Sequence, residues 1–211
     1  LGALDKEQQI TPLGTQMAKL PVDPQLARIL VQPDLVAVEE MLIICSLMSV
    51  REIRERPHDK QQKADQLHQI YNKNDSDILT AINLWKQLDE RKKELSSNAF
   101  KQWCNTHLIN FLGWLEWRKV YFQLKESVEN LGIKVNQSEA HDDEVFMGLI
   151  PGFITHIFCK TQDKYYQGVR DLKIWLHPSS LLFKKNKAWL LSAEMIETEK
   201  LYARMNCQIQ P

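Results

Sequence analysis

The stretch that decides the fold is HLINFLGWLEWRKVYFQLKESVENLG, residues 107–132. Its apolar residues recur at helical spacing over about seven turns. This pattern predicts a long amphipathic helix over residues 107–131, with Gly132 at the position just past its end. Such a helix buries its apolar side against other helices. The stretch therefore predicts a domain that is mainly helical.

The sequence on both sides of this stretch supplies the partner helices, and the helical domain is expected to span residues 35–159. Asp59 and the cluster Asp75–Asp77 are typical helix caps, and Pro151 is expected to bend the last helix. The first helix is apolar on most faces, which predicts a buried, central position. The expected helices cover residues 36–48, 59–71, 78–94, 96–104 and 145–158.

Two proline pairs punctuate residues 1–34. Thr11-Pro12 and Asp23-Pro24 each place a capping side chain before a proline at the first helical position. They predict short helices around residues 13–19 and 25–32. Because this segment is too small to hold a core alone, we expect a partial winged-helix module.

The period of the pattern changes after residue 160. Short segments there alternate or carry β-branched and aromatic residues, and residues 178–180 and 184–187 look like turns. Several short strands in about 50 residues favour a small barrel such as an OB fold over residues 160–211. The fold class is thus α+β, mainly α. The strands are expected over residues 165–169, 172–177, 188–192 and 200–209.

Composition and missing motifs exclude several functions. The chain has 27 basic and 27 acidic residues, so no global charge indicates a nucleic-acid or membrane partner. It contains no phosphate-binding loop, no dinucleotide-binding glycine motif and no zinc-protease or nucleophile-elbow motif. The cluster HDDE, residues 141–144, has side chains that can bind metal, but an acidic helix start explains it better. We therefore expect no catalytic residue, no metal site and no cofactor within these residues.

The four cysteines and the longest uncharged stretch indicate the compartment. The cysteines lie about 50 residues apart with no cysteine or histidine cluster, as expected for reduced, buried thiols. Residues 145–159 carry no charge, but 15 residues are too few to span a bilayer. The chain begins at Leu1 without a signal peptide and looks like a piece of a longer protein. We expect a cytoplasmic location and no membrane partner.

A local surplus of positive charge is the main functional signal. Residues 151–191 contain seven basic residues against Asp163 and Asp171, a surplus of five. Cations neutralise phosphates and aromatic rings stack on bases, which together is what single-stranded nucleic acid requires. The alternative is a solvated loop whose lysines guard sheet edges and whose aromatic rings fill the barrel. The basic residues are Lys160, Lys164, Arg170, Lys173, Lys184, Lys185 and Lys187, interleaved with Tyr165, Tyr166, Trp175 and Trp189.

Two other groups have weaker claims to bind nucleic acid. Trp103, Trp114 and Trp117 could stack on bases, but their helical spacing favours a place in the core. The arginines of residues 51–56 could reach phosphate, although Glu52 and Glu55 beside them make local ion pairs equally plausible.

Several segments, together spanning nearly the whole chain, resemble DEAH-box RNA helicases. Residues 1–30 resemble the winged-helix end of these proteins. Residues 54–71, 74–88 and 101–124 resemble their helical ratchet domain, and residues 148–158, 165–183 and 188–209 resemble the end of that domain and the OB fold after it. The most specific motifs are DKQQKAD (59–65), SSNAF (96–100) and HPSSLLF (177–183), and they look most like the bacterial HrpA type.

The resemblance implies a 3′-to-5′ ATP-dependent RNA helicase whose two RecA-like motor domains lie outside this chain and bind ATP and magnesium. The ratchet and OB domains would form the far wall of the single-strand channel. The long helix with Trp117 and Arg118 would line this channel, and the hydroxyls of Ser179 and Ser180 would meet a phosphate. The implied partners are single-stranded RNA, the protein's own motor domains and protein activators.

One departure from the family pattern shifts the expected site. Family members often have basic residues in the long ratchet helix where this chain has Gly113 and Leu115. We therefore expect the OB surface to carry more of the RNA contacts, and His177 to be a structural turn residue. The alternative function is a protein-interaction module that docks activator or ribosome-associated partners.

Overall fold

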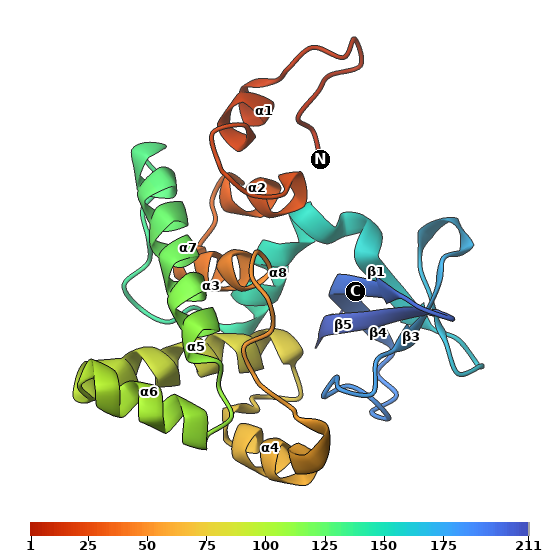
Figure 1. Ribbon diagram of the computed structural model, residues 1–211. Coiled ribbons are helices and arrows are strands. Elements are labelled where there is room, and N and C mark those ends of the chain that lie inside the picture. Colours follow the sequence, from red (N-terminus) through yellow and green to blue (C-terminus); the bar gives the residue numbers. More distant parts are fainter. Residues whose placement is uncertain (211) are drawn as a thin grey trace.

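The computed structural model describes residues 1–210, with its α-helices within residues 12–153 and its strands within residues 157–208 (Figure 1). The expected class, mainly α with a small barrel, is confirmed. The α-helices are α1 (Pro12–Met17), α2 (Pro24–Leu30), α3 (Val38–Leu47), α4 (Gln61–His68), α5 (Asp77–Glu94), α6 (Ser97–Thr106), α7 (Phe111–Asn130) and α8 (Asp142–Phe153). The strands are β1 (Ile157–Lys160), β2 (Tyr166–Gln167), β3 (Lys173–Leu176), β4 (Trp189–Glu197) and β5 (Leu201–Gln208).

Side-chain caps start four helices where the sequence predicts them. The Thr11 hydroxyl oxygen accepts the Gly14 N–H at 2.9 Å, and the Asp23 carboxylate accepts the Gln25 N–H at 2.8 Å. Ser76 and Ser96 cap α5 and α6 in the same way. Each cap satisfies a backbone donor that has no partner within its helix, which fixes the helix start locally.

The long helix α7 begins at Phe111, four residues later than predicted, and ends as predicted. Leu108 has a φ of 54°, which breaks the helical path, and the Asn110 side chain then caps α7 by accepting the Gly113 N–H at 2.7 Å. At the other end Gly132 has a φ of 80°, and the Ile133 N–H donates to the Val128 carbonyl. This is the usual glycine-terminated helix end.

The helical core forms where α7 crosses the buried helix α3 and the flanking helix α5. Trp114 and Trp117 of α7 are fully buried, and both rings contact Trp85 of α5 at centroid distances of 4.9 Å. Aromatic groups of this size bury a large apolar area and account for much of the stability of a core. The interpretation of these two tryptophans as core residues is confirmed.

Two of the predicted helices are wrong in part. Asp59 caps no helix: residues 58–60 form a 3₁₀ turn, and α4 follows from Gln61 without a side-chain cap. The apolar run predicted as a helix over 145–158 ends at Phe153, and its last residues enter β1. Phe158 fills the barrel and pairs with Leu190 of β4, so tertiary pairing overrides the local helical pattern.

The five strands close into a barrel in the order β1-β2-β3-β5-β4. Only the pairing of β3 with β5 is parallel within the described residues. Gly168 lies against the Phe158 ring, where a Cβ atom would approach within 2.6 Å, so only glycine fits. The barrel core consists of Phe158, Tyr166, Ile174, Leu176, Leu182, Leu190 and Ala203.

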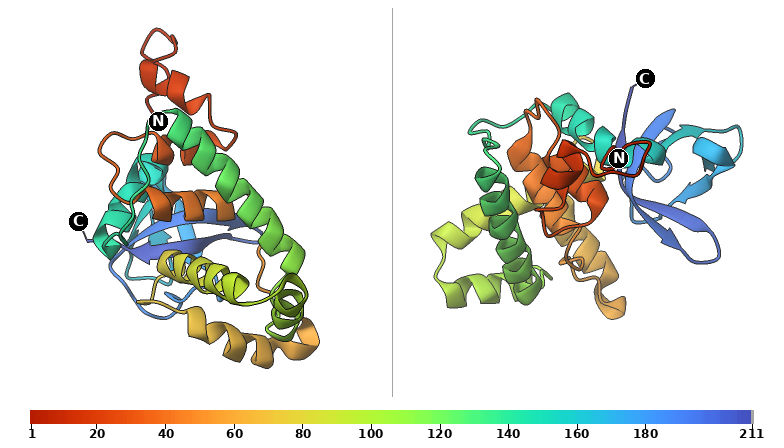
Figure 2. Two further views of the ribbon diagram at one scale, coloured as in Figure 1. Left: turned by 90° about the vertical axis from the view of Figure 1, so that its left-hand side faces the viewer. Right: turned by 90° about the horizontal axis from the view of Figure 1, so that it is seen from above.

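The barrel and the helices share buried surface. Leu191, Ala193 and Cys207, on β4 and β5, belong to the core of the helical part and not to the barrel core. The barrel therefore rests on the helices through one face of this hairpin, while β2 and β3 lie on the side away from α7 (Figure 2). No helix among residues 1–210 combines the length and the apolar character needed to cross a lipid bilayer.

Candidate nucleic-acid interface

Two lysines and two aromatic rings form a continuous row on the outer face of the barrel. The ammonium group of Lys173 lies 4.9 Å from the Tyr165 ring centroid, and that of Lys200 lies 4.9 Å from the Trp175 ring centroid. The two rings contact each other, with centroids 5.8 Å apart. We call these four residues the lysine–aromatic row. Along β3, Ile174 points into the barrel while the row residues on either side of it point outward.

The row lies on the elements by which OB folds bind oligonucleotides, the face of the second and third strands with the loops after the first and fourth. Tyr165 ends the loop between β1 and β2, Trp175 belongs to β3, and Lys200 ends the turn between β4 and β5. Lys200 is not among the predicted site residues, because it lies outside the basic segment, beside Glu199. The parallel pairing of Trp175 with Tyr202 brings this turn to β3.

The structure separates the other predicted aromatic residues from the row. Tyr166 is only 2% exposed and fills the barrel, which is the alternative that the sequence left open for these rings. Its burial raises the pKa of the phenol, and its hydroxyl donates to the Lys187 carbonyl at 2.9 Å. The ammonium of Lys160 lies 4.8 Å from the same ring. Trp189 is half-buried at the start of β4.

The remaining predicted cations lie on two loops. Lys164 and Arg170 are exposed on either side of β2. Lys184 is exposed near the Phe183 ring, whereas Lys185 turns toward the helices and forms an ion pair with Asp75 at 3.5 Å. The structure thus groups Lys164, Arg170 and Lys173 around β2 and β3. Lys184 and Lys185 belong to a separate loop that faces α5.

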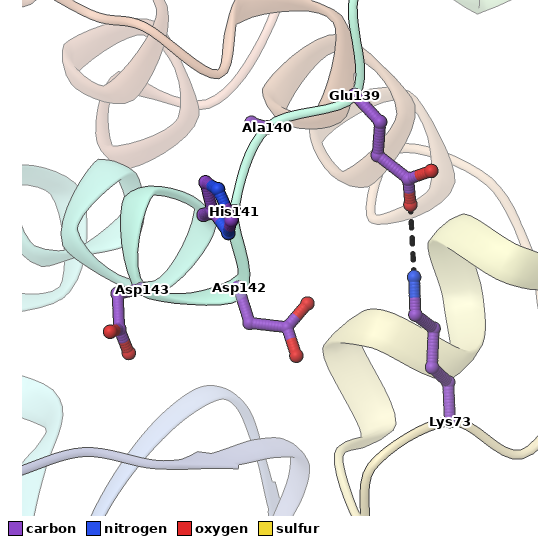
Figure 3. Close-up of a pocket in the computed structure, with 6 residues that line it drawn as sticks. All are labelled: Lys73, Glu139, Ala140, His141, Asp142 and Asp143. Carbon is purple, nitrogen blue, oxygen red and sulfur yellow. Dashed lines mark hydrogen bonds and ion pairs between the residues drawn. The ribbon is translucent and has the colours of Figure 1, made fainter.

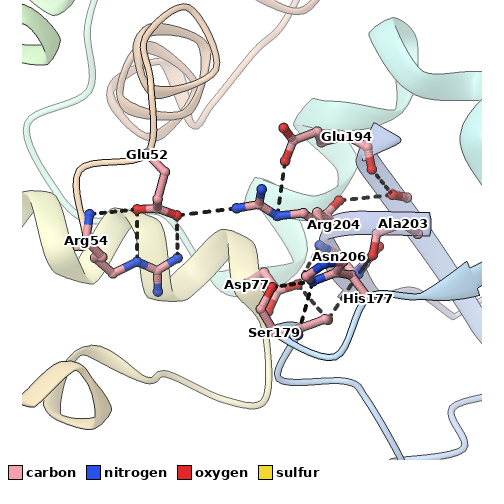
Figure 4. Close-up of polar contacts among 11 residues, drawn as sticks. Glu52, Arg54, Asp77, His177, Ser179, Glu194, Ala203, Arg204 and Asn206 are labelled. Carbon is pink, nitrogen blue, oxygen red and sulfur yellow. Dashed lines mark hydrogen bonds and ion pairs between the residues drawn. The ribbon is translucent and has the colours of Figure 1, made fainter. Parts of the chain in front are cut away.

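The polar groups of the turn at residues 177–180 mainly form hydrogen bonds within the protein (Figure 4). Ser180 is 7% exposed, and its hydroxyl donates to Asp77 Oδ2 at 2.7 Å, so the predicted phosphate contact by Ser180 is wrong. Ser179 is exposed, and its N–H donates to His177 Nδ1 at 3.2 Å. Burial and the charge of Arg204 lower the pKa of His177, in keeping with a turn residue that accepts a hydrogen bond.

The long helix α7 presents fewer side chains for contact with RNA than the resemblance implies. Trp117 is fully buried and its Nε1–H donates to Ser46 Oγ at 3.0 Å, so it cannot line a channel. Arg118 is partly exposed, with its Nε 3.4 Å from Asp89 and its guanidinium over the Phe122 ring. In both figures α7 lies on the side of the molecule away from the barrel, so Arg118 does not join the barrel cations (Figures 1 and 2).

An open polar pocket of about 630 Å³ lies at the start of α8 (Figure 3). Glu139 accepts hydrogen bonds from Lys73 and lies 2.9 Å from Lys86, and these contacts lower its pKa to about 2. The cluster at residues 141–144 forms the first turn of α8, where the Glu144 carboxylate accepts the His141 N–H at 2.7 Å. Over residues 1–210, no three His, Cys, Asp or Glu side chains are arranged to hold a metal ion.

A polar network joins the helices to the barrel next to the turn at His177 (Figure 4). The Arg54 guanidinium donates twice to the Glu52 carboxylate, at 3.1 and 2.9 Å, and Arg204 of β5 lies 3.5 Å from the same carboxylate. Burial raises the pKa of Glu52, but the charge and hydrogen bonds of Arg54, with the charge of Arg204, outweigh burial and lower it to about 2. Of the arginines at residues 51–56, Arg54 forms the local ion pair that the sequence left open as one alternative, whereas Arg56 pairs with the more distant Asp65 at 2.7 Å.

This pKa predicts how acid weakens the junction. A carboxyl group whose pKa falls from 4.5 to about 2 on folding stabilises the protein above pH 4.5. That contribution is lost progressively as the pH falls toward 2. We expect Glu52→Gln to lose less stability than the parent between about pH 5 and pH 3. Urea unfolding at the two pH values measures this, and Glu7→Gln, at an exposed carboxylate, is the control. Equal losses in Glu52→Gln and the parent would refute it.

Two family models match the chain at its two ends. A helicase-associated winged-helix domain (HA2) model matches residues 1–22, and an oligonucleotide/oligosaccharide-binding (OB) fold model matches residues 148–211. The second match covers α8 from Gly148 onward and the whole barrel, including the lysine–aromatic row.

Curated relatives match along the whole chain. The ATP-dependent RNA helicase HrpA of Escherichia coli is 41% identical over 218 residues, which cover 100% of this chain and 17% of the relative. The HrpA homolog of Haemophilus influenzae is 36% identical over 98% of this chain and 16% of its own length. The splicing factor and ATP-dependent RNA helicase prp22 of Schizosaccharomyces pombe is 31% identical over 100% of this chain and 18% of its own length.

The chain thus spans less than a fifth of the length of these relatives. The whole-chain identity, the two domain matches and the barrel agree with one another. This chain belongs to the HrpA-type DEAH-box helicases and is a C-terminal accessory region of such a protein.

Proposed function

We propose that this region binds single-stranded RNA and guides it through a channel that faces the motor domains of a 3′-to-5′ helicase. The observation that carries the proposal is the lysine–aromatic row, which occupies the oligonucleotide-binding face of an OB barrel. The names of the relatives, all RNA helicases, support RNA as the ligand.

The proposed division of labour follows the three segments of the chain. Residues 1–34 are the partial winged-helix module, residues 35–159 the ratchet domain and residues 160–211 the OB domain. ATP and magnesium would be bound by the motor domains of the longer protein, since the phosphate-binding motif of such motors is absent from this sequence.

The proposed phosphate contacts are made by cations of the barrel surface. Exposed ammonium and guanidinium groups bind phosphates without regard to sequence, and they release counterions from the strand when they do so. A guiding surface needs this tolerance because RNA of any sequence has to pass. The proposed contacts are the cations Lys160, Lys164, Arg170, Lys173, Lys184, Lys185, Lys187 and Lys200, with the Ser179 hydroxyl beside them and Arg118 on α7 as a separate contact.

Reversing three exposed charges tests the proposal. We expect the triple change Lys164→Glu, Lys173→Glu and Lys184→Glu to weaken binding of a fluorescent 12-mer single-stranded RNA at least tenfold at low salt. The slope of log affinity against log salt concentration should also become less negative by about 2, which is about 0.7 for each phosphate that the protein no longer neutralises. Fluorescence anisotropy at several salt concentrations measures both quantities.

A matched control separates the effect of where the charges lie from the effect of the total charge of the protein. Lys6→Glu, Lys19→Glu and Lys63→Glu change the net charge by the same amount at exposed positions on the N-terminal module and α4. We expect this control to bind RNA nearly as well as the parent. If both triple variants weaken binding equally, the barrel surface is not the site.

A protein-docking function is the second candidate, and one observation favours it. Helix α7 exposes Leu112, Leu115 and Phe122, spaced so that they share one side of the helix. A chain that binds no RNA even at low salt, but retains protein partners after nuclease treatment, would support docking in place of RNA guiding.

A further inference from the structure

We propose that Tyr165 and Trp175 form a stacking subsite for adjacent bases of the bound strand, and that Lys173 and Lys200 leave the two rings to contact the flanking phosphates. This inference rests on the proposed function and assigns roles within it. The row, in this view, binds the bases as well as the backbone of the strand.

The backbone segments that carry the two rings are held in place before any ligand arrives. The Tyr165 carbonyl accepts hydrogen bonds from the Thr161 N–H at 3.3 Å and the Thr161 hydroxyl at 2.7 Å, which closes the loop before β2. Trp175 lies within β3 between strands β2 and β5 and pairs with Tyr202. Because both backbones are fixed, stacking on these rings requires little further ordering of the protein.

A lysine ammonium group lies over each ring and can move away from it. Tyr165 and Trp175 are half-buried, and a lysine at the surface over such a ring is held weakly, whereas a phosphate attracts the same ammonium group more strongly. Within residues 1–210 neither Lys173 nor Lys200 forms an ion pair with a carboxylate, and Asp171 accepts a hydrogen bond from Gln167. An incoming strand can therefore draw both ammonium groups onto its phosphates and expose the ring faces to its bases.

The arrangement fits a nucleic-acid strand better than an acidic peptide. An acidic peptide offers charges to the lysines but has no regular series of flat groups for two adjoining rings. A single strand offers neighbouring bases with phosphates on either side, as the row offers two adjoining rings with a lysine at each end. Stacking is tolerant of sequence, because every base has a π face.

The test compares two 12-mers that differ only in their bases. The 211-residue chain is titrated at low salt with oligoadenylate and with an abasic oligomer of the same sugar-phosphate backbone. We expect the chain to bind oligoadenylate at least about 30-fold more tightly, as stacking of two bases on the two rings predicts. Trp175→Ala and Tyr165→Ala should each remove most of this preference, and 2-aminopurine placed in the strand should be quenched by the parent only.

Further variants show whether a loss of binding comes from a lost contact or from misfolding. Lys173→Gln with Lys200→Gln alters only exposed side chains, and it should weaken binding of both oligomers by a similar factor while the preference for bases persists. Tyr165→Phe should retain the preference. The control Phe183→Ala removes another exposed ring that lies beside a lysine, and it should change nothing.

The outcomes distinguish this inference from the proposed function. If the parent binds both oligomers equally, it holds phosphates alone: the stacking subsite is overturned and the RNA-guiding function stands. If a glutamate-rich peptide binds as tightly as oligoadenylate, the row serves an acidic protein partner and the subsite is overturned. If the parent binds neither oligomer, the RNA-guiding function fails and the subsite fails with it.

Discussion

Trp117→Ala is expected to lower the free energy of unfolding by about 4 kcal/mol, the largest single effect we expect in this chain. Trp117 is fully buried, contacts Trp85 and Trp114, and donates through Nε1–H to Ser46 Oγ at 3.0 Å. The substitution leaves a cavity at the crossing of α3 and α7, and it removes the donor that Ser46 uses. Urea or thermal unfolding measures the loss.

Two comparisons separate this effect from a role in RNA binding. Leu112→Ala, at a 73% exposed position of the same helix, should change stability by about 0.5 kcal/mol or less. Trp117→Phe retains most of the apolar volume, and its affinity for RNA should equal that of the parent. An RNA affinity that falls in Trp117→Phe while stability holds would show that the ring reaches the strand, contrary to its burial.

Asp77→Ala is expected to lower the free energy of unfolding by about 3 kcal/mol, because one carboxylate joins the helices to the barrel. Asp77, the first residue of α5, accepts hydrogen bonds from Ser180 Oγ at 2.7 Å, the Leu181 N–H at 2.8 Å and the Asn206 N–H at 3.0 Å. Without the carboxylate these partly buried donors have no acceptor from α5, and leaving them unsatisfied is costly.

The neighbouring acid provides the control for this prediction. Asp75→Asn removes an exposed ion pair with Lys185 and keeps a side chain that tolerates the φ of 49° at this position, so it should cost about 0.5 kcal/mol or less. Chemical denaturation compares the two variants, and limited proteolysis of the loop after Ser180 reports whether the barrel has loosened. If Asp77→Ala unfolds at the same denaturant concentration as Asp75→Asn, the junction does not depend on the Asp77 carboxylate.

Local signals in the sequence predicted the helices well, because each depends on residues close in the chain. Thr11, Asp23, Ser76 and Ser96 cap helices through backbone groups two or three residues away. The glycine-terminated end of α7 is equally local. Such features are visible in a single sequence because no distant partner decides them.

What the sequence did not reveal depends on distant partners. The strand β1 looks like the end of an apolar helix until Phe158 meets Leu190 across the barrel. Ser180 looks like an exposed turn hydroxyl, yet its acceptor, Asp77, lies 103 residues earlier. The lysine–aromatic row was predicted only in part, because Lys200 reaches Trp175 through the parallel pairing of β3 with β5.

The course of these two strands has a mechanical consequence. Strand β3 carries Trp175 and runs on into the turn that contains Ser180, while β5 begins beside Lys200 and includes Asn206. Both strands therefore run from the outer row to the same acceptor on α5. A pulling force on an RNA strand held at the row would be passed along the hydrogen-bonded backbone of these strands into the helices. The barrel would then transmit the force rigidly instead of moving as a flexibly linked unit.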